Sequence, residues 1–148
     1  MQGYMTESCV FQRLMNAVAA GTSTQSSSRV DLQTQNADAV CFALTFGDVL
    51  DTCAIVVRVM ENTPDGTSGA TAIPGASYTA TAGATDHDNK IVLIDVKRSK
   101  ITKRYVYLEV ARATANAIID GVTAIIYEKS ALPVTQDSSV VNTTQAGS

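Results

Sequence analysis

The sequence predicts an all-β fold, a β-sandwich of the jelly-roll or Greek-key type, and three observations carry that prediction. Residues 103–112 alternate with a period of two, so that Val106, Leu108 and Val110 share one face, which is the pattern of a half-buried strand. About seven strand-like segments follow one another, separated by turn residues. Between residues 29 and 136 no segment has clear helical spacing, and long connections rich in glycine and alanine favour a Greek-key path over a simple meander.

The composition bounds the kind of protein this is. The chain has 148 residues, the usual size of one domain, with 17% charged residues and a formal net charge of -3. It lacks the basic stripe that binds nucleic acid and the long apolar run that spans a membrane, so neither partner is expected. Cys9, Cys41 and Cys53 show no CxxC spacing, so neither a disulfide framework nor a zinc site is predicted, and no cofactor is expected.

The N-terminal segment, residues 1–28, is predicted to be an arm and linker outside the domain. Val10, Leu14 and Val18 recur with helical spacing within the first 20 residues, which predicts a short amphipathic helix or an extended arm. Residues 21–28 are a run of glycine, serine, threonine and glutamine, typical of a flexible linker. The β-sandwich domain is therefore expected to span residues 29–136.

The strands of the domain follow in order, each bounded by turn residues. Arg58 marks the wetter face of the third strand, and the Asn-Thr-Pro-Asp-Gly run after that strand is a strong turn signal. Residues 67–83, rich in glycine, alanine and threonine, are expected to form a long connection with one irregular strand. The confident strands are expected at residues 29–33, 39–46, 52–61, 90–96, 103–112 and 122–127.

The chain leaves the domain in extended form. Pro133 cannot continue a central strand, so residues 132–136 are expected to run outward, and residues 137–148, rich in serine, threonine and asparagine, are expected to be a flexible tail. A compact domain with an arm before it and a tail behind it is suited to attach to neighbouring molecules, which would order those segments.

Motifs that would carry catalysis are sparse. His87 is the one histidine and lies between Asp86 and Asp88; this is interpreted as a polar turn, with a cation site as the alternative. No GxSxG motif or phosphate-binding loop is present. Asp95 and Glu109 could form a carboxylate pair, but a sugar cleft normally brings tryptophan, and the chain has none. The sequence therefore predicts a protein that is not an enzyme and has no catalytic residues.

The residues most suited to an interface are aromatic and lie on a polar strand face. Tyr105 and Tyr107 fall on the face opposite Val106, and aromatic rings there bury much area while keeping a hydroxyl for a hydrogen bond. The alternative is that both faces of this strand are partly covered. The full set of candidate interface residues is Tyr105, Tyr107, Arg58, Leu132, Pro133 and Val134.

The order of several motifs resembles a known family. The motifs are Arg-Val-Asp-Leu from residue 29, Asp-Ala-Val-Cys-Phe-Ala-Leu-Thr-Phe-Gly from residue 38, Glu-Asn-Thr-Pro-Asp-Gly-Thr from residue 61, Asp-Asn-Lys from residue 88, Lys-Arg-Tyr-Val-Tyr-Leu-Glu-Val from residue 103 and Leu-Pro-Val-Thr-Gln from residue 132. Together they resemble small head proteins of tailed bacteriophages, the cement or decoration proteins. The resemblance covers residues 29–136 and does not extend to residues 1–28.

This resemblance implies a non-enzymatic virion structural protein, made in the host cytoplasm and placed on the outer capsid surface. Such proteins bridge major capsid subunits and stabilise the head, so the expected partners are the major capsid protein and further copies of the chain itself. Two alternatives remain open: a tail or head–tail joining component, and a carbohydrate- or receptor-binding β-sandwich module.

Overall fold

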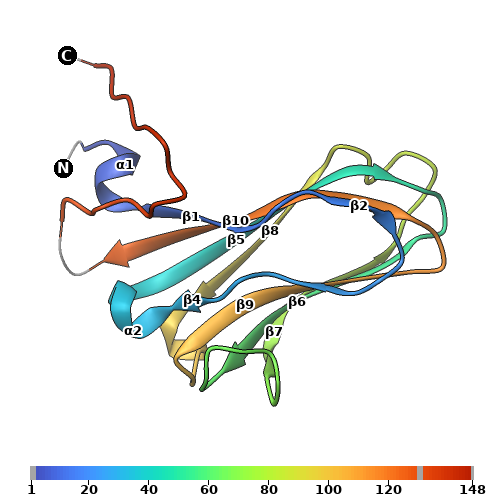
Figure 1. Ribbon diagram of the computed structural model, residues 1–148, viewed down its shortest axis with the longest axis horizontal. Helices are drawn as coiled ribbons and strands as arrows, with labels where there is room; N and C mark the ends of the chain where they lie inside the picture. Colours follow the sequence, from blue (N-terminus) through green and yellow to red (C-terminus); the bar gives the residue numbers. More distant parts are fainter. Residues whose placement is uncertain (1–2, 130–131, 148) are drawn as a thin grey trace.

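The protein is a sandwich of two antiparallel five-stranded sheets (Figure 1). The computed structural model describes residues 3–129 and 132–147. Sheet A contains β1 (Val10–Met15), β2 (Val18–Gly21), β5 (Ala37–Val49), β8 (Ile91–Lys97) and β10 (Ala117–Lys129). Sheet B contains β3 (Gln25–Ser26), β4 (Val30–Asp31), β6 (Ala54–Asn62), β7 (Thr71–Thr81) and β9 (Tyr105–Ala113). The described helices are short: α1 (Met5–Ser8), α2 (Leu32–Gln35) and the 3-10 turn η1 (Arg98–Lys100).

The strand order is that of a jelly roll. Sheet A runs β1-β10-β5-β8 with β2 also on β10, and sheet B runs β3-β9-β6-β7 with β4 also on β9. If β1 and β2 count as one interrupted strand, and β3 and β4 as another, each sheet has four strands and the chain crosses between the sheets as two Greek keys do. The predicted β-sandwich is confirmed, and of the two predicted types the strand order matches the jelly roll.

The core lies between the two sheets and follows the alternation expected for β9. Val106, Leu108 and Val110 are each 0% exposed, and the facing residues of β5 and β6 are buried in the same way. Burying a side chain of this size contributes about 1.5–3 kcal/mol, so the inward faces of these central strands supply most of the driving force for folding. The largest core side chains outside β9 are Phe42, Phe46, Leu44, Ile55, Ile119 and Ile126.

Of the two forms expected for the first 20 residues, a short amphipathic helix or an extended arm, the helix is wrong beyond Ser8, because β1 and β2 form there. β1 pairs with β10, and Val10 and Leu14 are 1% and 4% exposed. Residues four positions apart share one face of a helix and also one face of a strand, because strand faces alternate with a period of two. The spacing of Val10, Leu14 and Val18 therefore does not distinguish a helix from a strand. The division of the chain at residue 28 stays a prediction about independent folding, and the pairing of β1 in sheet A argues against it.

Two other segments are more regular than expected. The segment expected as a linker contains β3. Next to it, Ser27 forms two hydrogen bonds with the backbone of Leu108. The Ser27 N–H donates to the Leu108 carbonyl and the Ser27 hydroxyl oxygen accepts the Leu108 N–H, both at 2.9 Å. Residues 67–83, expected as a long connection with one irregular strand, contain the 11-residue strand β7, whose pairing with β6 shifts register. Small residues hide such strands from a pattern search, since their ladder bonds come from the backbone.

The first strand predicted for the domain, residues 29–33, is shorter than expected. β4 ends at Asp31, whose side chain accepts the N–H groups of Gln33 and Thr34 and so caps α2. None of the helices among the described residues is long and apolar enough to cross a membrane.

Candidate interaction surface

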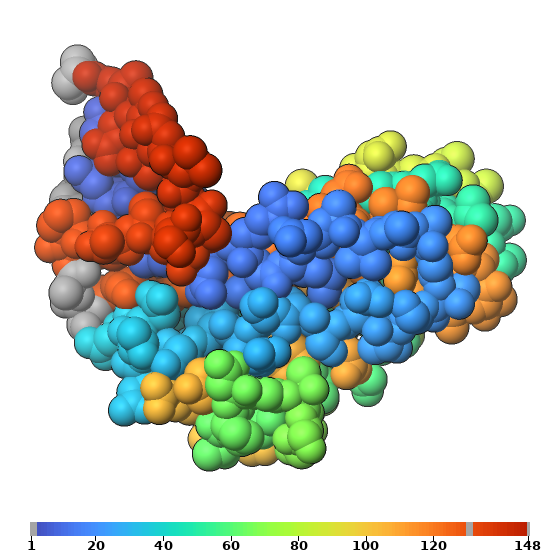
Figure 2. Space-filling view, in the orientation of Figure 1, coloured from blue at the N-terminus to red at the C-terminus, as the bar shows by residue number. Residues whose placement is uncertain are grey.

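The chain ends form a projecting structure, which we call the terminal arm and define as Tyr4 and α1 together with residues 132–147. In Figures 1 and 2 the two ends of the chain lie side by side and stand off one end of the sandwich. Gln145 of the tail donates from Nε2 to the hydroxyl of Thr6 in α1 at 2.9 Å. The tail expected to be loose therefore lies against α1 in this structure.

Gln136 and Ser139 fasten the arm to the free edge of β1. The side-chain oxygen of Gln136 accepts the Phe11 N–H at 2.9 Å, and its Nε2 donates to the carbonyls of Thr6 and Cys9. The Ser139 hydroxyl accepts the Arg13 N–H at 3.0 Å. Because the other side of β1 pairs with β10, these side chains occupy backbone donors that an edge strand would otherwise leave open.

Three candidate interface residues lie at the start of the tail. Leu132 is 51% exposed, and a cis peptide bond joins it to Pro133, which is also exposed. Val134 is half-buried against the core and donates its N–H to the Glu7 carbonyl at 2.8 Å. Leu132 and Pro133 are therefore presented to solvent, while Val134 helps to anchor the arm.

Large exposed apolar side chains concentrate on this arm. Among the described residues seven large hydrophobic side chains are exposed, and four of them belong to the arm: Tyr4, Met5, Leu132 and Val141. Val141 is 100% exposed. Exposed apolar side chains gathered on one projection are typical of a surface that becomes buried against another protein.

The outer face of sheet B carries the second group of candidates. Arg58 on β6 faces Glu109 on β9, and its guanidinium donates to the carboxylate at 2.7 Å. Tyr105 is half-buried, with the Arg104 guanidinium carbon 5.0 Å from the centre of its ring. The Arg104 guanidinium also donates two hydrogen bonds of 2.8 Å to the Asp31 carboxylate. These bonds hold the pKa of Asp31 well below its usual range and raise the pKa of Arg104.

Tyr107 is not on an exposed face. Its side chain is 1% exposed, and burial raises the pKa of its hydroxyl, with the Glu109 carboxylate adding to the rise. The alternative weighed above, that both faces of this strand are covered, holds at Tyr107. An interface role for the remaining candidates stays a prediction, and Tyr107 supports the fold instead.

The side chains of the Asp86-His87-Asp88 turn form hydrogen bonds within the fold. His87 Nε2 lies 2.8 Å from the Tyr78 hydroxyl, and its Nδ1 lies 2.6 Å from Asp86 Oδ1, a contact that lowers the pKa of Asp86. Asp88 accepts the Val49 N–H at 2.9 Å. Within residues 3–129 and 132–147 no three histidine, cysteine or acidic side chains gather closely enough to hold a metal ion.

The two carboxylates considered for sugar chemistry do not face each other. Asp95 lies on β8 in sheet A and accepts the Tyr127 hydroxyl with both oxygens, at 2.6 and 2.7 Å. That bond, followed by burial, raises the pKa of Tyr127. Glu109 lies on β9 in sheet B, paired with Arg58. The pair therefore does not line a common cleft.

Arg112 is a buried residue that the sequence reading did not single out. It is 2% exposed at the inward end of β9, where its guanidinium donates to the carbonyls of Ala19, Ser23 and Ala117. Burial lowers its pKa. The sequence does predict that Arg112 points into the core, because it lies two positions after Val110 on the same strand face. Arg112 closes one end of the sandwich by linking β9, β10 and the segment between β2 and β3.

Comparison with known proteins gives a likeness of fold. No protein-family model matches the chain, and no curated protein matches it by sequence. The VP2 subviral particle of infectious bursal disease virus matches with a TM-score of 0.50 at 13% identity, over 86% of this chain and 34% of that one. T=1 particles derived from the same virus match with a TM-score of 0.50 at 15% identity, over 86% of this chain and 33% of that one. This chain spans about a third of those chains, and the likeness shows that it shares the β-sandwich fold of a viral capsid protein.

Proposed function

We propose that this chain is a virion structural protein of a tailed bacteriophage that binds the outer capsid surface and cements the head by bridging major capsid subunits. The protein would act without catalysis, and its partners would be the major capsid protein and further copies of itself. The fold it shares with viral capsid proteins supports a structural role in a virion, and the motif order between residues 29 and 136 supports the narrower reading.

The terminal arm is the observation that carries the proposal. Side-chain bonds from Gln136 and Ser139 fix its base to β1, while Leu132 and Val141 remain exposed beyond the sandwich. An arm held at its base needs to lose less conformational freedom on binding than a disordered tail does. Repeated over many copies, modest contacts of this kind would add up to firm attachment across subunit junctions.

Co-sedimentation with purified capsid shells tests the proposal. Val141→Asp places a charge on the arm and is expected to reduce binding to expanded shells about tenfold or more, because a buried unpaired charge is costly. Leu50→Asp is the matched control, since Leu50 is 47% exposed and follows β5 at the end where β10 begins. Equal binding by the two variants would refute the arm as the attachment surface.

The alternatives give different results in the same assay. A tail or head–tail joining component would bind a single vertex of the particle and saturate at a small ring of copies. A carbohydrate-binding module would bind neither expanded nor unexpanded shells and would bind glycans instead.

A further inference from the structure

Three of the four sheet edges are protected against pairing with another strand. The tail covers β1 through Gln136 and Ser139. One edge of sheet B consists of β3 and β4, each two residues long. β7 contains Pro74, its Gly75 has a φ of 82°, and its pairing with β6 shifts register in that region. Short strands, proline and bulges are the usual devices that block edge pairing.

The remaining edge, β8, has none of these three devices, although two of its outward-facing residues, Asp95 and Lys97, are charged. It pairs with β5 over seven residues without a register shift, contains neither proline nor glycine, and has no second strand neighbour among the described residues. The Phe46 N–H donates to the Lys90 carbonyl, so the alternation of an antiparallel ladder turns the N–H and C=O groups of Ile91, Leu93 and Asp95 away from β5. A regular edge of this length whose first half presents Ile91 and Leu93 is able to accept a further strand.

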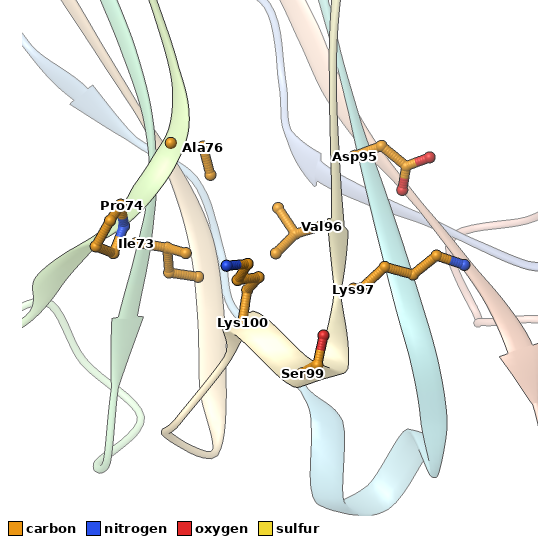
Figure 3. Close-up of a pocket in the computed structure, with 9 residues that line it drawn as sticks. Ile73, Pro74, Ala76, Asp95, Val96, Lys97, Ser99 and Lys100 are labelled. Atoms are coloured by element: carbon orange, nitrogen blue, oxygen red, sulfur yellow. The ribbon is translucent and has the colours of Figure 1, made fainter.

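The side chains and the space beside β8 are also open. Ile91 and Leu93 are 61% and 64% exposed, and with the four arm residues they make up most of the exposed large hydrophobic side chains. A cavity of about 420 Å³ lies between β7 and β8. Figure 3 shows Ile73 and Val96 pointing into this gap, with Asp95 and Lys97 on the other side of β8.

Charge identifies the occupant. The turn before β8 carries Asp86 and Asp88 against the single cation Lys90, and the other end of the strand carries Lys97, Arg98 and Lys100 against the single anion Asp95. Two β8 strands that run antiparallel place the acidic turn of each beside the basic turn of the other, so this edge is complementary to itself. We propose that two copies of the chain pair antiparallel through β8, with Leu93 on the two-fold axis.

Leu93 at the axis gives a register in which opposite charges face each other. Leu93 then lies opposite Leu93 of the second copy, and Asp88 lies opposite Arg98. A shift that puts Ile94 on the axis would instead set Lys90 opposite Arg98, and like charges directly opposite each other destabilise a sheet. The result is one continuous sheet through both copies, with an isologous interface.

This inference deepens the self-association part of the proposed function but does not need a shell to test. Sedimentation equilibrium of the purified full-length chain is expected to show a monomer–dimer equilibrium. Leu93→Lys is expected to weaken the dimer about tenfold or more, because lysine on an edge strand opposes pairing. Leu50→Lys, the same change at an exposed leucine outside the sheets, is expected to leave it unchanged.

Cysteine cross-linking tests the register. In a chain with Cys9→Ser and Cys41→Ser, Leu93→Cys is expected to form a disulfide-linked dimer on mild oxidation, because paired Cα atoms at the axis lie about 5.5 Å apart, within the range of a disulfide. Ile91→Cys is the matched control, since its two copies would be offset by about 14 Å.

Three results would overturn the proposal: a wild-type monomer at every concentration, a dimer that survives Leu93→Lys, or equal cross-linking of both cysteine variants. Failure here is distinct from failure of the cement proposal. A monomer that still binds shells would remove only the β8 dimer, and a β8 dimer that binds no shell would remove only the cement role.

Discussion

The side-chain oxygen of Gln136 accepts the backbone N–H of Phe11 at 2.9 Å, across 125 positions of the sequence. The same side chain reaches the carbonyls of Thr6 and Cys9. One residue thus joins the tail, α1 and the first strand of sheet A.

Replacing this residue is expected to release the arm and spare the sandwich. Gln136→Ala removes three hydrogen bonds worth about 1 kcal/mol each, so hydrogen exchange at the Phe11 amide should accelerate at least about tenfold, while amides of β6 and β9 stay protected. Gln145→Ala removes one bond farther along the arm and should leave Phe11 protected. Unchanged exchange at Phe11 in Gln136→Ala would show that other contacts hold the arm.

The two tyrosines of β9 are expected to behave differently. Tyr107→Ala empties a buried site and should lower the free energy of unfolding by about 3 kcal/mol or more, measured by urea denaturation. Tyr105→Ala removes a half-buried ring beside Arg104 and should cost distinctly less. Similar losses in both variants would contradict the assignment of Tyr107 to the fold and Tyr105 to the surface.

The Asp31–Arg104 pair predicts how stability depends on pH. Because Arg104 lowers the pKa of Asp31 in the folded chain, the charged carboxylate stabilises the fold at pH values above its unfolded pKa of about 4. That contribution is lost as the pH falls below this value towards the folded pKa. The wild type should therefore lose more stability between about pH 5 and pH 2 than Asp31→Asn.

Asn at position 31 is a fair substitute because asparagine also caps helices, so α2 keeps its cap while the charge is removed. Asp65→Asn is the control, since Asp65 pairs with Arg29 in a more exposed position. If Asp31→Asn and the wild type lose stability in parallel on acidification, the pair does not act as described.

Truncation tests the division of the chain at residue 28. Deleting residues 1–28 removes β1, β2 and β3, and with them the edge partners of β10 and half of those of β9. From these contacts we expect the truncated chain to lose cooperative unfolding. A truncated chain that still unfolds in one sharp transition would support the predicted domain of residues 29–136.

Local patterns predicted the parts of the fold in which side chains carry the signal. β5, β6 and β9 could be predicted because their inward-facing residues are large and recur at every second position. β1 was not predicted as a strand because the spacing of Val10 and Leu14 fits both a helix and a strand. β7 was expected only as one irregular strand within residues 67–83, because its residues are mostly small. Gln136 bonds to Phe11 across 125 positions, a relationship that no window of neighbouring residues contains.

The candidate site was predicted in part for the same reason. Leu132 and Pro133 were expected to leave the domain, and both are exposed, but Val134 and Gln136 return to the core and to β1. The burial of Tyr107 depends on what covers the outer face of β9, and alternation within one strand shows only which residues share a face. The open edge of β8 follows from the order of strands in sheet A, which only the assembled fold provides.

The most direct test of the central claim is the number of copies bound at saturation when the purified chain is sedimented with expanded and with unexpanded capsid shells. A cementing protein should saturate expanded shells at hundreds of copies, in a multiple set by the symmetry of the shell, and bind unexpanded shells weakly. Saturation at a few copies per particle, or no binding to either shell, would contradict the account.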